Sequence, residues 1–155
     1  TGQGKVFSAG ADLEAVASGL ATSPAWERLS GAIAAFEGLT IAALNGTVAG
    51  GALGMVLACD VRIAVVGAKF FYPVLKMGVL PQPSDPARLR ELVGPARAKM
   101  MLLGGAKITT DDAFAFGLID NIVADQATLE AEIALLTTMA GTAKSGLVAS
   151  IKAMI

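Results

Sequence analysis

The sequence predicts a single-domain α/β fold, and two observations support this prediction. Short apolar stretches with strand character alternate along the chain with segments whose apolar residues recur at helical spacing. The chain has 155 residues, which is the length of one typical domain, and neither a linker nor an internal repeat divides residues 1–155. A domain of this size forms a hydrophobic core without disulfides or metal ions, in agreement with a single cysteine, Cys59.

Strands are expected where short apolar runs end at turn-forming residues. The Asn45-Gly46 pair is typical of a turn and closes one such run, and Pro73 interrupts another. The expected strands cover residues 5–8, 41–44, 61–65, 70–72 and 118–123.

Helices are expected between these strands. Asp12 is a typical N-terminal cap for a short helix over residues 13–17. Apolar residues from Trp26 to Phe36 recur every three or four positions, which predicts a helix that Gly38 ends. Further helices are expected over residues 50–59, 87–93, 95–103, 110–116, 129–139 and 148–155, with a loop at 21–24 and an irregular, proline-containing segment at 81–86.

The composition excludes several classes of function. Apolar residues make up 54% of the chain and charged residues only 16%, so part of the apolar surface is expected to be covered by a partner chain or by a missing segment. The net charge of −1 provides no basic excess for nucleic-acid binding. The chain contains no histidine, which excludes histidine-dependent nucleophilic catalysis and the usual zinc and haem sites. No metal site is predicted.

One uncharged stretch, residues 38–59, is long enough to be tested as a membrane span. Its several glycines and the Asn45-Gly46 turn favour a buried strand, a tight loop and a buried helix instead. No basic region followed by an apolar stretch begins the sequence, so no signal peptide is expected. The expected location is therefore cytoplasmic.

Two sets of motifs are specific enough to indicate a family. The first is Phe7-Ser8-Ala9-Gly10-Ala11-Asp12-Leu13, and the second runs from Ile41 to Gly46, through Ala49-Gly50-Gly51, to residues 59–64. In this order, and with Gly78-Val79-Leu80-Pro81 after them, they resemble the crotonase superfamily, the enoyl-CoA hydratase/isomerase group. The resemblance implies the ββα spiral fold, here without its N-terminal and C-terminal portions, and a homotrimer or hexamer.

The resemblance also implies binding of an acyl-CoA thioester, with no further cofactor. The family stabilises a thioester enolate with two backbone N–H groups, which the resemblance places at Ala11 and Gly51. The Gly50-Gly51 pair fits this role independently, because glycine lets a ligand approach the backbone and an amide at a helix start has no helical partner. The alternative is a tight turn that needs glycine for its backbone conformation alone.

Three further residues are expected to contact coenzyme A by resemblance. Lys5 corresponds to a basic residue near the phosphates, although a solvated lysine is an equal alternative. Ala9 and Leu13 correspond to residues that line the adenine. The complete expected coenzyme A set is Lys5, Ala9, Ala11, Leu13, Gly50 and Gly51.

The chain departs from the family at the two positions where hydratases carry catalytic glutamates. Gly54 and Val74 stand there, and neither side chain can move a proton. Asp85 is the carboxylate expected over the acyl pocket and is the candidate for an acid/base role; the alternative is that it caps the following helix. Helix propensity favours Glu over Gly, so Gly54→Glu is expected to fold unless close packing requires the glycine.

The expected function is therefore acyl-CoA chemistry of the enoyl-CoA hydratase/isomerase type, with an oxyanion hole and with non-standard or weakened acid/base catalysis. The alternative is a non-catalytic acyl-CoA carrier or sensor. Tyr72 is either a hydrogen-bond donor to the ligand or a core or rim tyrosine. The apolar residues expected to line the pocket, which favour an apolar acyl group, are Val74, Leu75, Met77 and Leu80.

Overall fold

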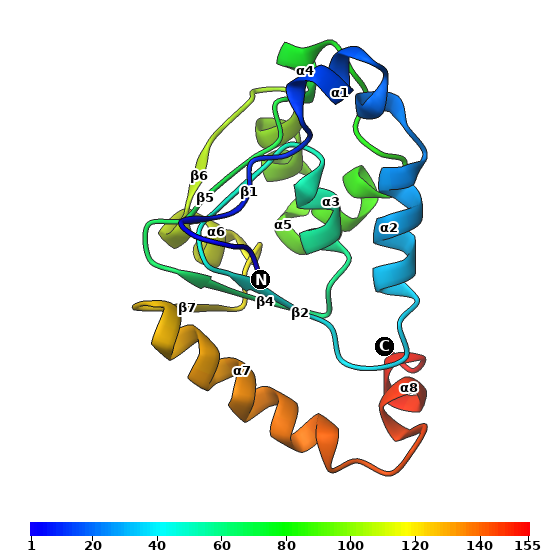
Figure 1. Ribbon diagram of the computed structural model, residues 1–155, viewed down its shortest axis with the longest axis vertical. Helices are drawn as coiled ribbons and strands as arrows, with labels where there is room; N and C mark the ends of the chain where they lie inside the picture. The colour runs from blue at the N-terminus through cyan, green and yellow to red at the C-terminus, as the bar shows by residue number, and fades with distance from the viewer.

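Two small sheets form the centre of the fold (Figure 1). The computed structural model describes residues 1–155, apart from the side chains of Leu13 and Ala17. Paired strands are parallel except for the last pair of the first sheet. That sheet has the order β1 (Val6–Ser8), β3 (Thr47–Ala49), β5 (Lys69–Phe71) and β6 (Ile108–Thr109), and the second has β2 (Ile41–Leu44), β4 (Val61–Val65) and β7 (Asn121–Val123).

Helices surround the two sheets. The α3 and α5 helices lie between the first sheet and α2, whereas α7 runs along the second sheet on the opposite side (Figure 1). The helices are α1 (Leu13–Ala17), the 3-10 turn η1 (Leu20–Thr22), α2 (Ala25–Ala34), α3 (Ala52–Leu57), α4 (Val74–Met77), α5 (Asp85–Leu102), α6 (Thr110–Phe116), α7 (Gln126–Gly141) and α8 (Leu147–Lys152). None of the helices described is long and apolar enough to cross a membrane.

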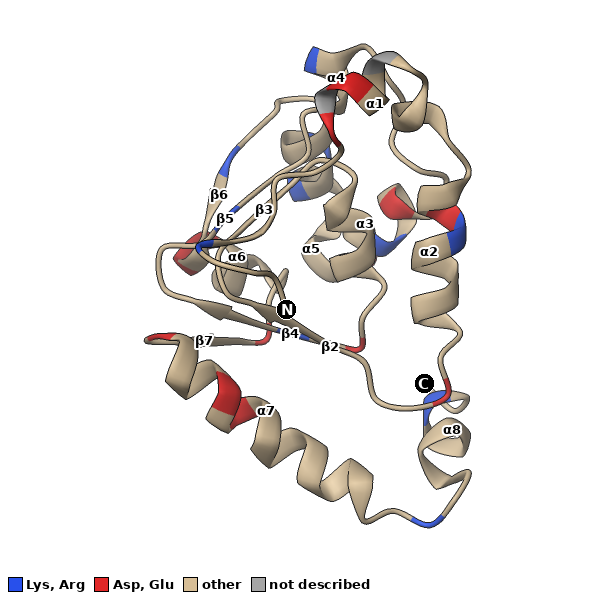
Figure 2. Cartoon of the chain, viewed as in Figure 1, with Lys and Arg blue, Asp and Glu red and all other residues tan. Residues whose placement is uncertain are grey.

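The main hydrophobic core packs around α3. Leu53 of α3, Phe70 of β5 and Leu89 of α5 are fully buried within it. No charged residue belongs to α3, whereas other elements, among them α2 and α7, carry charged residues (Figure 2). Each large apolar side chain buried in this way contributes about 1.5–3 kcal/mol, so these contacts stabilise the packing of α3 against β3, α2 and α5.

The predicted α/β class is confirmed, and the elements with strong local patterns have the predicted bounds. The predictions for residues 13–17, 41–44 and 61–65 match α1, β2 and β4. Gly94 adopts a φ of 80° and interrupts α5, so the predicted boundary between two helices is also confirmed.

Other predicted bounds are wrong. The helix predicted to reach Gly38 ends at Ala34, and part of the predicted loop at 21–24 forms the 3-10 turn η1. The elements β3, β6 and α4 are not among the predicted ones, and each has only two to four residues. Segments this short depend on pairing with distant strands rather than on local periodicity.

Candidate functional site

Two loops that follow neighbouring parallel strands meet at one end of the first sheet. Residues 9–11 follow β1 and residues 50–51 follow β3, and Ser8 pairs with Val48. A Cβ atom on Gly10 would lie 3.0 Å from the Ala49 carbonyl oxygen and 3.7 Å from the Gly50 Cα. The loops are therefore in backbone contact, and a side chain at Gly10 would separate them.

The two glycines of the second loop are not equally required. Gly50 has a φ of 60°, a left-handed conformation that favours glycine. Gly51 has a helical φ of −59°, but a Cβ atom there would lie 3.3 Å from the indole ring of Trp26. Backbone conformation alone therefore explains Gly50, whereas a Cβ atom at Gly51 would require only a small shift of the Trp26 ring.

The amides of Ala11 and Gly51 have no acceptor among the residues described. Their neighbours do: the Gly50 N–H donates to the Phe71 carbonyl oxygen at 3.0 Å, and the Gly10 N–H donates to the Ser8 Oγ at 3.2 Å. Both unpaired amides belong to residues that line one cavity. The arrangement can therefore present two backbone donors to a bound ligand.

The cavity has a volume of about 120 Å³ and is walled mainly by apolar residues. Ala9, Gly10 and Gly50 also line it. Three of the four residues predicted to form an apolar lining do so, but the Leu75 side chain is 65% exposed and borders a separate surface hollow. The apolar wall includes Val16, Trp26, Val74, Met77, Val79 and Leu80.

Asp85 is the first residue of α5, and its side chain is only 1% exposed. Its Oδ2 accepts a hydrogen bond of 2.8 Å from the Tyr72 hydroxyl. A Cβ atom on Gly54 would lie 2.6 Å from the Asp85 Oδ1 and 2.8 Å from its Oδ2. The carboxylate therefore occupies the space that any side chain at position 54 would need.

The alternative that Asp85 caps the helix is wrong. The N-cap of α5 is Ser84, and no side chain of α5 or of its N-cap makes a capping hydrogen bond. A carboxylate at a helix start ordinarily accepts from the free backbone N–H groups. Here the contacts with Tyr72 and Gly54 turn the Asp85 carboxylate into the core instead.

The buried environment changes the protonation of both groups. Burial raises the pKa of the Asp85 carboxyl to about 6, although the Tyr72 hydrogen bond and the positive charge of Arg88 lower it. Burial, together with the negative charge of Asp85, raises the pKa of the Tyr72 phenol well above its ordinary value. The Asp85 Oδ1 has no hydrogen-bond partner among the residues described.

Glu27, on α2, holds the segment that leads into α5. The Ser84 N–H donates to the Glu27 Oε2 at 3.2 Å, and the Ser84 hydroxyl donates to the Glu27 Oε1. These hydrogen bonds lower the pKa of the Glu27 carboxyl. Nothing local in the sequence distinguishes Glu27, so it is not among the predicted site residues, and Trp26 is predicted only as part of an amphipathic helix.

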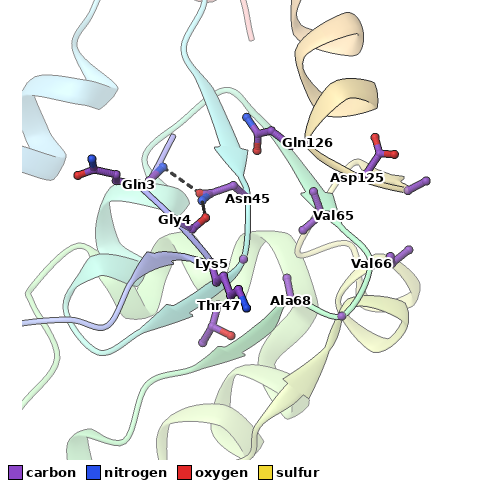
Figure 3. A pocket seen from close by; sticks show the side chains of 14 residues that line it. Gln3, Gly4, Lys5, Asn45, Thr47, Val65, Val66, Ala68, Asp125 and Gln126 are labelled. Carbon is purple, nitrogen blue, oxygen red and sulfur yellow. Dashed lines mark hydrogen bonds between the residues drawn. The ribbon is translucent and has the colours of Figure 1, made fainter.

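Not all predicted site residues lie together. Lys5 precedes β1, at the opposite end of this strand from residues 9–11, and borders an open hollow of about 570 Å³ (Figure 3). In that hollow the Asn45 side chain accepts from the Gly2 N–H at 2.9 Å and donates to the Gly4 carbonyl oxygen at 3.0 Å. The prediction for Leu13 concerns a side chain that lies outside the described residues.

Comparison with known proteins gives consistent matches. The model of the enoyl-CoA hydratase/isomerase family matches residues 1–155. The chain is 38% identical over 130 residues to crotonyl-CoA hydratase of Syntrophomonas wolfei, which covers 79% of this chain and 50% of the relative. It is 34% identical over 159 residues to 4-chlorobenzoyl coenzyme A dehalogenase-1 of an Arthrobacter species, which covers 96% of this chain and 58% of the relative.

A solved structure agrees with these matches. Pseudomonas aeruginosa DspI superposes with a TM-score of 0.86 and 34% sequence identity, covering 97% of this chain and 59% of DspI. This similarity confirms the predicted crotonase-like fold. The chain spans between half and three fifths of the length of the proteins compared.

Proposed function

We propose, because the chain belongs to the enoyl-CoA hydratase/isomerase family, that its cavity binds the thioester end of an acyl-CoA. The observation that carries the proposal is the pair of unpaired amides, Ala11 and Gly51, on two touching loops beside one apolar cavity. A thioester oxygen that accepts from both amides gains most when an enolate forms, since negative charge then develops on that oxygen. The names of both relatives specify coenzyme A thioesters.

The cavity favours a short, apolar acyl group. Its volume of about 120 Å³ is below the roughly 300–1,000 Å³ of sites that enclose a drug-sized ligand. It therefore holds the reacting end of the thioester, while the nucleotide lies outside it. Ala9 lines the cavity and is proposed to contact coenzyme A, as are Lys5 and Leu13 farther along the ligand.

The proposed acid/base chemistry is non-standard. Gly54 and Val74 supply no titratable group, and a positioned acid or base contributes about 10²–10⁴-fold, so hydration of a simple 2-enoyl-CoA is expected to be slow. Asp85 is the nearby carboxylate. The second candidate function, a non-catalytic acyl-CoA carrier, is favoured by the observation that Asp85 is not among the described residues of the cavity wall.

Calorimetric titration of the intact protein with butyryl-CoA, and with coenzyme A alone, tests the binding site. Gly51→Pro deletes the backbone donor, and Gly51→Ala retains it while adding the same Cβ atom beside Trp26. We expect only the proline variant to lose the preference for butyryl-CoA over coenzyme A. Equal preferences in the two variants would show that the Gly51 amide does not bind the thioester.

We also propose a homotrimer or hexamer in the cytoplasm. The support is apolar surface on α7, where Leu135 is 67% exposed and Met139 76%, and just after α8, where Met154 is 85% exposed. Side chains of this kind are commonly covered by a partner subunit. Analytical ultracentrifugation of the intact protein tests the assembly, and a strict monomer contradicts it; cell fractionation tests the location.

A further inference from the structure

We propose that Tyr72 is the residue that exchanges a proton with the acyl substrate, and that Asp85 is a positioning residue that acts through it. The inference rests on the proposed function, because it requires a thioester in the cavity. Tyr72 is the only titratable side chain among the described residues that line the cavity. A proton that moves to or from a ligand in this space has no other described side chain to receive it.

The Tyr72 hydroxyl lies between a donor and an acceptor. It donates to the Asp85 Oδ2 at 2.8 Å, and the Gln82 N–H donates to the phenol oxygen at 3.4 Å. Tyr72 and Gln82 both line the cavity, whereas Asp85 lies behind them against Gly54. Tyr72 therefore belongs to the cavity wall and also contacts the buried carboxylate.

The backbone places this phenol close to the two unpaired amides. The Gly50 N–H donates to the carbonyl oxygen of Phe71 at 3.0 Å, which ties the residue before Gly51 to the residue before Tyr72. The end of β5 and the second glycine loop are thus fixed side by side. If a thioester oxygen accepts from these amides, we expect its α-carbon to lie in the cavity that Tyr72 lines.

The Asp85 carboxylate is more than a packing element. It is buried, its Oδ1 has no partner among the described residues, and a buried carboxylate with an unused oxygen is costly. A neutral side chain would partner the phenol at lower cost. The buried charge is explained if the carboxylate must take the phenol proton.

The proton transfer is balanced without any further reactant. With Asp85 ionised, the α-carbon–hydrogen bond of the thioester breaks and its proton bonds to the Tyr72 oxygen, while the phenol proton moves to the Asp85 Oδ2. The electron pair of the broken bond passes into the enolate, whose oxygen accepts from the Ala11 and Gly51 amides. The reverse step returns a proton to carbon and restores both side chains.

This transfer requires ionised Asp85, so its rate depends on pH. The groups that face this carboxylate are Tyr72 from the end of β5, Glu27 from α2 and Arg88 from α5, whereas α3 contributes only Gly54 and no charge. With a pKa of about 6 for Asp85, the rate is expected to rise with pH through about 6 and to level off above it.

The test is exchange of the α-protons of butyryl-CoA with deuterated water, followed by NMR in the intact protein between about pH 5 and pH 8. We expect Tyr72→Phe to lower the exchange rate by about 100-fold or more while leaving the affinity for butyryl-CoA unchanged. Asp85→Asn should lower the rate and abolish its rise near pH 6. Asp111→Asn, the same change at an exposed residue of α6, is the matched control and should alter neither.

A second variant keeps the test decisive where Tyr72→Phe fails to fold. Incorporation of 3-fluorotyrosine at position 72 retains the phenol and its contact with Asp85 but makes the phenol more acidic. A tyrosine that moves the proton gives an altered exchange rate at unchanged affinity, and its fluorine resonance shifts as Asp85 titrates. A purely structural tyrosine gives an unchanged rate.

The outcomes separate the inference from the proposed function. Unreduced exchange in Tyr72→Phe, or an unchanged rate with 3-fluorotyrosine, overturns the role of Tyr72 and leaves thioester binding intact. Binding of butyryl-CoA without any exchange in the native protein also overturns it and favours the carrier. Failure to bind butyryl-CoA at all overturns the proposed function itself.

Discussion

Gly54→Ala places a methyl group where the Asp85 carboxylate lies, and its effect on stability can be worked out from the structure. The new Cβ atom would lie 2.6 Å from Oδ1, 2.8 Å from Oδ2 and 3.0 Å from Cγ of Asp85. Both residues are buried, so the carboxylate must move and its 2.8 Å hydrogen bond from Tyr72 must break.

Three effects on the free energy of unfolding compete. Alanine is favoured over glycine inside a helix by about 1 kcal/mol. Overpacking a core costs about 1–3 kcal/mol, and loss of a hydrogen bond to a charged acceptor costs about 1.5–3 kcal/mol. We therefore expect Gly54→Ala to lower the free energy of unfolding by about 1.5–5 kcal/mol.

Urea unfolding monitored by circular dichroism measures this change. Gly31→Ala in α2 is the matched control, because no described atom lies within 4 Å of its new Cβ atom, and it should gain up to about 1 kcal/mol. In an Asp85→Ala background the cost of Gly54→Ala should largely disappear. A Gly54→Ala protein as stable as the native one, or an unchanged cost without Asp85, would refute the reasoning.

Three further predictions concern pH, ligand size and binding. The raised pKa of Asp85 means that the native state binds more protons than the unfolded state between about pH 4 and pH 6, so this group's contribution to stability falls as pH rises through that range. Asp85→Asn should therefore stabilise the protein more at pH 8 than at pH 4, as urea unfolding at the two values will show. Butyryl-CoA should bind more tightly than dodecanoyl-CoA, because the cavity is only about 120 Å³; calorimetry that ranks them in the opposite order contradicts the short-acyl proposal. Trp26 lines this cavity and packs against Gly51, so acyl-CoA binding should change its fluorescence, and a response that persists in Trp26→Phe would show that the signal comes from elsewhere.

Local sequence patterns predicted most of the longer elements and one part of the site. Asp12 caps α1 as predicted, accepting from the Ala15 N–H at 2.9 Å. The glycine motifs of the two loops also lie together, because each follows a strand of the same parallel pair. A turn needs particular residue types at particular positions, so a turn motif after a strand can be recognised from a few residues.

The contacts of Asp85 could not be predicted in the same way. An aspartate before a proline at a helix start is locally a cap, yet its partners Gly54 and Tyr72 lie on other elements of the chain. Likewise, Glu27 holds Ser84 across 57 positions of the sequence. Gly54→Glu is predicted to fold only if close packing does not require the glycine. In the structure the Asp85 carboxylate fills the space beside Gly54, so close packing does require it. The roles of these residues depend on tertiary contacts, which local sequence periodicity does not reveal.

The position of this carboxylate limits the chemistry proposed for the site. A carboxylate at position 54 would extend from α3, whereas Asp85 reaches the same region from the start of α5 and meets the cavity only through Tyr72. One phenol backed by one carboxylate can move one proton at a time. Hydration of a double bond also needs a group to hold and activate water, and Val74 cannot act in that way. We therefore expect this site to move a proton at the thioester α-carbon and to hydrate a double bond only slowly.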